Sequence, residues 1–147
     1  MGDACGLQAR TRYCKAMSQK IETLRAFVEA FNRKDLDDAV RFLHPDVEIY
    51  PAIGGELDVS HRYRGRNEGR QLFETITDGV EPHVEIEDAI EAEEGQVLLV
   101  EHWSPRSSQG VETSFELGTI YTFQDGLVVR LEGFRDPAKA RAAAGLT

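Results

Sequence analysis

The sequence contains little cysteine, and this scarcity excludes two kinds of architecture. Its two cysteines, Cys5 and Cys14, both lie near the N-terminus and stand beside no cluster of histidines or further cysteines. Small disulfide frameworks and structural zinc sites need more such residues at close spacing. We therefore expect neither, and the chain fits a reducing compartment such as the cytoplasm.

Long apolar runs and an excess of positive charge are also missing. The longest apolar stretch lies at residues 97–100, far short of the roughly 18 residues that a membrane-spanning helix needs. The 17 Lys and Arg residues are outnumbered by 26 Asp and Glu residues, which leaves a net charge of -9. Nucleic acids and anionic lipids bind through basic surfaces, so we expect neither nucleic acid nor a membrane as a partner.

Several cofactor motifs are absent as well. The sequence contains no Walker loop, no glycine-rich dinucleotide turn, no His-Glu-x-x-His and no Gly-x-Ser-x-Gly. No pair of histidines stands at helical or strand spacing beside a carboxylate that would complete a metal site. The sequence therefore predicts no nucleotide, flavin or metal cofactor.

What the sequence does contain is sufficient for one domain. A chain of 147 residues with 41% hydrophobic and 29% charged residues can bury a sizeable core. Residues 1–17 lack the apolar segment of a secretory signal, and Met17 resembles a second start. We expect residues 1–17 to be a disordered or mis-started extension, or at most an extension of the first helix, and residues 18–147 to form the domain.

Hydrophobic periodicity predicts three helices followed by a run of strands. The first helix begins behind a Ser18 cap, Asp35 caps the second and Asn67 caps the third. A short helix over residues 138–144 ends the chain. Period-two alternation and turn residues predict strands at residues 47–50, 83–92, 96–105, 111–123 and 127–134.

Helices first and antiparallel strands afterwards indicate an α+β fold rather than a parallel sheet. Long strands joined by tight turns twist and coil, so we expect a strongly curved antiparallel sheet wrapped on the three N-terminal helices. The cone between them is expected to hold an apolar pocket for a small-molecule ligand.

Three stretches of the sequence resemble SnoaL-like proteins of the NTF2-like superfamily, which has the fold of ketosteroid isomerase and polyketide cyclases. The first stretch contains FVEAFN, DLD and HPDVEIYP, between Phe27 and Pro51. The second is YRGRNEG at residues 63–69, and the third contains GVE, TFQDGLVVR and RDPAKA. The resemblance covers residues 18–146 and implies an NTF2-like cone. The superfamily includes isomerases, cyclases, hydrolases, dehydratases and non-catalytic adaptors, so the fold implies no single activity.

The catalytic residues of these relatives are missing at the matching positions. By the resemblance, the carboxylate base of ketosteroid isomerase falls at Tyr50, its tyrosine at Phe27 and its second acid at Thr119. The residue sets of SnoaL-like cyclases and of limonene epoxide hydrolase are likewise absent. The known chemistries of the superfamily are therefore not expected to carry over.

The expected strand register places one set of side chains on the concave face of the sheet, because alternate strand residues point the same way. The expected pocket residues are His102, Tyr50, Ser104, Arg106, Thr119, Tyr121, Arg135, Phe27, Leu117 and Leu131. A slip of one residue would bring another set inward. That set is Glu101, Trp103, Glu116, Gly118 and Ile120.

His102 is the predicted catalytic residue, because an unperturbed imidazole titrates near ~6.5 and can act as a general acid or base. Tyr50, Tyr121 and Arg135 are expected to hold ligand oxygens. Each residue also has a structural interpretation. A strand histidine more often packs with a hydrogen bond, a tyrosine packs with its hydroxyl in water, and Arg135 pairs with a neighbouring carboxylate.

The opposite, convex face is expected to carry Trp103 and Ile120. Exposed apolar groups there would be buried in a homodimer. The acidic residues between positions 85 and 94 are interpreted as a solvated strand edge rather than a metal patch.

Two functional hypotheses follow. The chain is either a cofactor-free enzyme of the isomerase, cyclase or hydrolase type acting on a small oxygen-bearing compound, or a non-catalytic module that dimerises and binds a ligand or partner. Whether the chain is an enzyme is left open by the sequence.

Overall fold

The computed structural model describes residues 11–51, 62–92, 95–110 and 113–146, with the backbone alone for residues 11–18. Its helices are α1 (Thr11–Asn32), α2 (Leu36–Val40), α3 (Gly65–Thr77) and α4 (Pro137–Ala143). Its strands are β1 (Leu43–Tyr50), β2 (Tyr63–Arg64), β3 (Val80–Glu81), β4 (Val84–Glu91), β5 (Gln96–Trp103), β6 (Arg106–Ser107), β7 (Phe115–Gln124) and β8 (Leu127–Phe134).

Six strands of the described chain form one sheet in the order β2-β1-β8-β7-β5-β4, and β3 pairs with β6 in a separate ribbon. The neighbours from β8 to β4 pair antiparallel, as predicted, and so do β1 and β2. The pair β1 and β8 is parallel, which the sequence did not indicate. The predicted α+β class and the curved sheet are confirmed.

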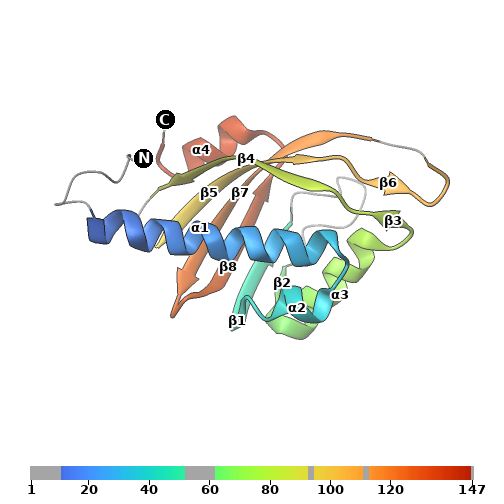
Figure 1. Cartoon of the computed structure of the whole chain (residues 1–147), viewed down its shortest axis with the longest axis horizontal. Coiled ribbons are helices and arrows are strands. Elements are labelled where there is room, and N and C mark those ends of the chain that lie inside the picture. Colours follow the sequence, from blue (N-terminus) through green and yellow to red (C-terminus); the bar gives the residue numbers. More distant parts are fainter. Residues whose placement is uncertain (1–10, 52–61, 93–94, 111–112, 147) are drawn as a thin grey trace.

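The helices lie on two sides of this sheet. Helix α1 crosses one face, and α2 and α3 lie together beside β1, while α4 packs on the opposite face (Figure 1). We call the face toward α1 the concave face and the face toward α4 the convex face. The space between α1, α3 and the concave face is where a ligand cavity can form.

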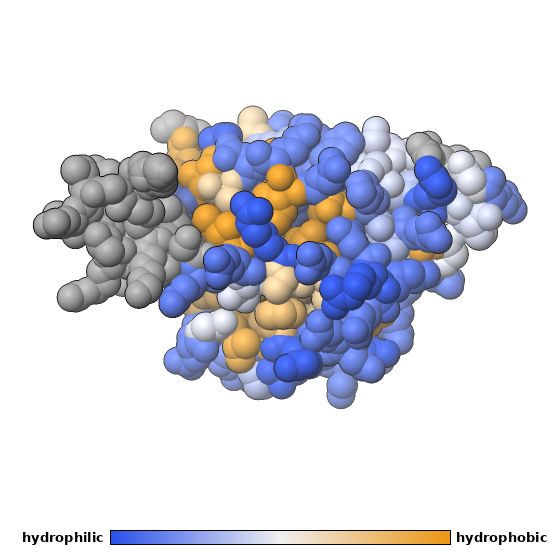
Figure 2. All heavy atoms as spheres, in the orientation of Figure 1, coloured by the Kyte–Doolittle hydropathy of each residue, from blue (hydrophilic) through white to orange (hydrophobic). Residues whose placement is uncertain are grey.

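The main hydrophobic core fills the layer between α1, α2, α3 and the concave face. It includes Leu24 and Phe31 from α1, Phe73 from α3 and Val97 and Leu99 from β5. Burial of such side chains stabilises the fold by about 1.5–3 kcal/mol each. Seen from outside, apolar residues gather around α1 near the middle of one face and polar residues surround them (Figure 2).

A smaller core lies between α4 and the convex face. Leu98 and Ile120 of the sheet pack there against Ala140 and Ala144, and all four side chains are buried. Ile120 is therefore covered by α4 within its own chain. Ile120 thus lies on the predicted convex face but is buried, whereas Trp103 lines the interior, so the prediction that both residues are exposed on the convex face is wrong.

The helix ends follow local capping chemistry, with some differences from prediction. Asp35 caps α2 as expected, and its carboxylate accepts a hydrogen bond from the Asp38 amide at 3.1 Å. Helix α1 begins at Thr11, so Ser18 lies inside it rather than at its start. Helix α3 begins two residues before Asn67, and the Arg64 amide donates to the Glu68 carboxylate at 2.7 Å, which satisfies a free backbone donor. Residues 11–17 extend helix α1 rather than being disordered, and residues 1–10 lie outside the described part of the chain.

Among the described residues, no helix has the length and apolar character that a membrane crossing requires.

Candidate functional site

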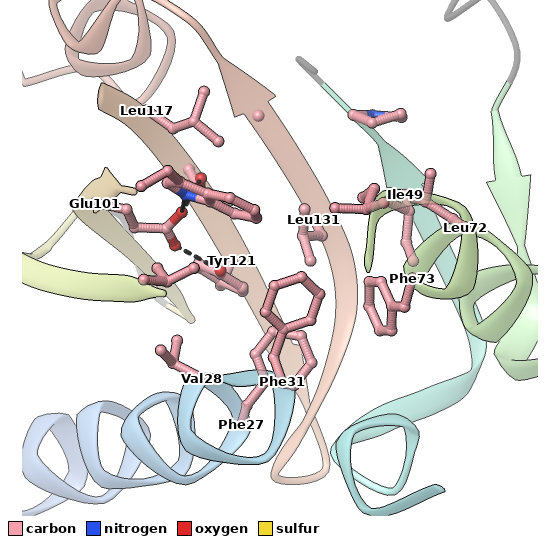
Figure 3. Close-up of a pocket in the computed structure, with 16 residues that line it drawn as sticks. Phe27, Val28, Phe31, Ile49, Leu72, Phe73, Glu101, Leu117, Tyr121 and Leu131 are labelled. Carbon is pink, nitrogen blue, oxygen red and sulfur yellow. Dashed lines mark hydrogen bonds between the residues drawn. The ribbon is translucent and has the colours of Figure 1, made fainter. Parts of the chain in front are cut away.

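The cone contains a cavity of about 70 Å³ between α1, α3 and the concave face of the sheet. Its walls are almost entirely apolar (Figure 3). The lining residues are Phe27, Val28, Phe31, Ile49, Pro51, Leu72, Phe73, Ile76, Val84, Glu101, Trp103, Leu117, Thr119, Tyr121, Leu131 and Gly133.

The pairing of β5 with β7 decides which side chains reach this cavity. Glu101 lies opposite Leu117, and Leu99 lies opposite Thr119. Residues directly opposite each other in an antiparallel pair share one face of the sheet. Odd-numbered residues of both strands therefore point inward, and His102 points outward with its partner Glu116.

Glu101 is the only carboxyl group among the described lining residues, and it is 2% exposed. Its Oε1 accepts a hydrogen bond from Trp103 Nε1 at 3.0 Å and another from Thr119 Oγ1 at 3.1 Å. The Tyr121 hydroxyl lies 2.7 Å from Oε2 (Figure 3). A buried polar group needs such partners, because each missing hydrogen bond costs about 1–3 kcal/mol.

These contacts constrain where Glu101 holds a proton. An indole N–H only donates, so Oε1 acts as an acceptor toward Trp103. A tyrosine hydroxyl both donates and accepts, so Oε2 either accepts from Tyr121 or carries the proton of a neutral carboxyl. The hydroxyls of Thr119 on Oε1 and of Tyr121 on Oε2 can both accept the proton of a neutral carboxyl, and the shorter contact, at 2.7 Å, is the one with Tyr121.

The surroundings raise the pKa of Glu101. Burial disfavours the carboxylate and outweighs the hydrogen bonds from Trp103, Tyr121 and Thr119, which act in the opposite direction. Burial and the adjacent Glu101 also raise the pKa of Tyr121 well above its ordinary value of 10.0. Glu101 is thus a buried acid that holds its proton more tightly than a glutamic acid in water.

Aromatic packing holds this network in place. The ring of Trp103 stacks on Phe115 with centroids 5.9 Å apart and meets Phe31 edge to face at 5.5 Å. The Tyr121 ring meets Phe27 edge to face at 6.2 Å. Such ring pairs add about 0.5–1.5 kcal/mol to the effect of burial alone, and here they restrict the two side chains that contact Glu101.

Five of the predicted pocket residues line the cavity. They are Phe27, Leu117, Thr119, Tyr121 and Leu131. The structure brings Thr119 and Tyr121 together on Glu101. The prediction missed Glu101 and Trp103 as pocket residues and named them only for a register slipped by one residue.

The predicted inward position of His102 is wrong. It lies on the convex face with Glu87 and Glu116, and one possible ligand atom from each residue lies within 4.8 Å of the others. Residue Glu87 is the extra residue of a bulge in β4, which lies between the pairs Ile86–Glu101 and Asp88–Val100. Contact with the Glu116 carboxyl raises the pKa of Glu87, and His102 lowers it.

These three side chains are of the type that binds divalent metals. Two of them are exposed, and exposed acidic groups are common on strands without any ion, so we assign no function to this group.

Tyr50 is also outside the cavity, because its neighbour Ile49 is the inward residue of β1. The Tyr50 hydroxyl donates to Glu48 at 2.9 Å, and the guanidinium of Arg130 lies 4.9 Å from the centre of its ring. Glu48 in turn forms an ion pair with Arg64 at 3.5 Å. Tyr50 therefore belongs to a polar network on the convex side of β1.

The remaining predicted pocket residues lie at the surface. Ser104 follows β5, and its amide donates to the His83 carbonyl at 2.8 Å. Arg106 lies in the separate β3–β6 ribbon, where it is exposed. Arg135 is exposed after β8, and its guanidinium lies 5.2 Å from the centre of the Phe115 ring. None of the three is among the described lining residues.

The fold and its apolar cavity define the class of the protein, a cone of the NTF2-like type. The sequence profile of the SnoaL-like domain matches residues 24–131, so the chain belongs to the SnoaL-like domain family. A comparison with curated proteins finds no match.

Solved structures with the same fold share little sequence with this chain. A limonene-epoxide-hydrolase-like epoxide hydrolase of Mycobacterium tuberculosis is 19% identical, with a TM-score of 0.66, and the match covers 88% of this chain and 93% of that one. Another M. tuberculosis protein, solved in complex with estradiol-17beta-hemisuccinate, is 13% identical with a TM-score of 0.71, and 80% and 94% of the two chains are covered.

A protein of Catenulispora acidiphila with a ketosteroid isomerase-like fold, in complex with trimethylamine, is 15% identical with a TM-score of 0.67. The match covers 86% of this chain and 94% of that one. At these identities the likeness establishes the fold alone.

Proposed function

We propose that this SnoaL-like protein binds a small, mostly apolar molecule inside the cone, with Glu101 as the polar contact. The observation that carries this proposal is a buried, hydrogen-bonded carboxyl group in the wall of an otherwise apolar cavity. Apolar cavities with a few fixed polar groups are the usual form of small-molecule sites. Two structural neighbours were solved in complex with a steroid ester and an amine, which supports small-molecule binding by this fold.

A small neutral alcohol tests this proposal. We expect tert-butyl alcohol, titrated into labelled protein, to shift NMR signals of residues that line the cavity, because its five heavy atoms suit a space of about 70 Å³. The substitution Leu117→Phe should abolish these shifts by filling the cavity.

Glu116→Phe provides the matched control, since it adds the same ring to the neighbouring residue on the other face of β7. If the shifts persist in Leu117→Phe, or if they map to the surface in the unmodified protein, the alcohol does not enter the cone.

A second candidate function is acid–base catalysis by Glu101 in place of the expected His102. The observation that favours it is the Oε2–Tyr121 contact, where a carboxyl with a raised pKa can give a proton to a bound ligand or take one from it. A buried acid of this kind is a common feature of catalytic sites.

For this candidate we expect a panel of ketones, epoxides and lactones to include a compound that the protein turns over. Glu101→Gln should then reduce turnover by about 10²–10⁴-fold while the compound still binds, because the amide keeps the shape of the side chain but transfers no proton. Unchanged turnover in Glu101→Gln would remove Glu101 from the chemistry and leave passive binding.

Homodimerisation and a cytoplasmic location stay predictions. The surface available for a dimer differs from the one expected, because α4 covers Ile120 and the Trp103 side chain contacts the interior.

A further inference from the structure

The charge of the cavity wall bears on the kind of ligand that it accepts. Among the described lining residues there is no Lys, Arg or His, so no side chain of the wall can neutralise an ionised Glu101. Its three hydrogen-bond partners are the neutral groups of Trp103, Thr119 and Tyr121. A buried charge is strongly disfavoured without an opposite charge close to it. A cationic ligand can supply this charge, and its binding then favours release of the proton that burial otherwise retains on Glu101.

The hydrogen bonds also leave room for one more donor. A carboxylate has about four acceptor positions, two on each oxygen. Oε1 accepts from both Trp103 and Thr119, whereas Tyr121 is the single partner of Oε2 among the residues that the structure describes. One acceptor position on Oε2 thus remains for a donor group of a ligand.

The rest of the wall suits the alkyl groups of a cation. Five aromatic side chains line the cavity: Phe27, Phe31, Phe73, Trp103 and Tyr121. Aromatic faces attract cations within about 6 Å, and most strongly where water is excluded. Because the space measures about 70 Å³, only a few heavy atoms can enter, and a group that reaches Glu101 also contacts these rings.

We propose that the cavity binds a small alkylammonium group, whose charged nitrogen donates to Oε2 of Glu101 and whose alkyl carbons contact the aromatic wall. This inference rests on the proposed ligand-binding function and specifies its ligand class. The net charge of -9 favours the same class, because it attracts cations to the protein from solution.

A matched pair of probes separates charge from shape. The ion tert-butylammonium and tert-butyl alcohol share one carbon skeleton and each carries a hydrogen-bond donor, but only the first is charged. At about pH 8, where an alkylamine is protonated, we expect the ion to bind about tenfold to a hundredfold more tightly than the alcohol. Hydrogen bonds to charged groups are stronger by about that amount. Affinities and contact residues would come from NMR titration.

Two isosteric substitutions locate the effect. Glu101→Gln should weaken binding of tert-butylammonium about tenfold or more and change binding of the alcohol by less than about threefold. Glu116→Gln removes the same charge from the convex face and should leave both affinities within about threefold. The comparison of the two probes on the unmodified protein needs no variant, so it holds even if Glu101→Gln folds poorly.

The results separate failure of the alkylammonium inference from failure of the proposed ligand-binding function. If the alcohol binds in the cone as tightly as the ion, or if Glu101→Gln binds the ion normally, the alkylammonium inference is wrong and ligand binding stands. If the ion shifts only surface residues, it is also wrong. If neither probe binds in the cone, both proposals fail.

Discussion

Replacing Gly118 by alanine is expected to lower the free energy of unfolding by about 1–3 kcal/mol. Gly118 lies in β7 beneath α4, and a Cβ atom there would be 2.6 Å from the Cβ of Ala140 and 3.0 Å from the Cα of Pro137. Both neighbours belong to α4, so the helix must move away from the sheet to make room. Chemical denaturation of the two proteins measures the loss.

A double-mutant cycle tests whether this contact is the cause. Ala140→Gly removes the methyl group at 2.6 Å and by itself costs about 1 kcal/mol of helix propensity. In the Gly118→Ala/Ala140→Gly protein the methyl group is in effect transferred to the strand, so the double mutant should be more stable than the sum of the two losses predicts. If the two losses in unfolding free energy simply add, contact with the Ala140 methyl group is not the cause of the destabilisation by Gly118→Ala.

The second large effect is the contribution of Glu101 to the dependence of stability on pH. Its pKa in the folded protein is raised by burial above the ordinary value of 4.5. Below about pH 4.5 both the folded and the unfolded chain hold this proton, so Glu101 does not make the unfolding free energy depend on pH there. At higher pH the unfolded chain releases the proton while the folded chain keeps it, and stability falls until pH passes the folded pKa.

Glu101→Gln should remove this dependence, because an amide does not titrate. The difference in unfolding free energy, unmodified protein minus variant, should therefore decrease with rising pH, with a slope of at most about 1.4 kcal/mol per pH unit for one proton. Denaturation curves at several pH values between about 4 and 8 measure it. A difference that stays flat or increases over this range would contradict the raised pKa.

Most of the fold could be predicted from the sequence because its signals are local. Helical periodicity marked α1, the Asp35 cap marked α2, and the Asp125-Gly126 turn set the pairing of β7 with β8. In β7 the inward positions of Leu117, Thr119 and Tyr121 were also predicted correctly. The parallel pairing of β1 with β8 joins segments far apart in the sequence, and no local pattern reports it.

The candidate site was predicted only in part, because β5 carries no readable alternation. Residues Val97, Leu98 and Leu99 are all fully buried, since the core covers one face of this strand and α4 covers the other at Leu98. A strand buried on both sides has a continuous apolar run, so its parity cannot be read from hydrophobicity. The register predicted for β5 was therefore shifted by one residue, and it placed His102 in the cavity wall where the structure has Glu101.

For β1 the sequence does indicate which side chains point inward. Val47 and Ile49 are apolar and alternate with Glu48 and Tyr50, which places Tyr50 on the same side as a charged residue. The structure follows this alternation, with Ile49 in the cavity wall and the Tyr50 hydroxyl bonded to Glu48.

The position of Trp103 makes the candidate site observable without any label. It is the single tryptophan of the sequence, and its indole lines the cavity and donates to the carboxyl of Glu101. The tryptophan fluorescence of the protein therefore originates beside this carboxyl, and its intensity and wavelength respond to the local charge and to displacement of water. A spectrometer can follow occupation of the cone in an unmodified sample.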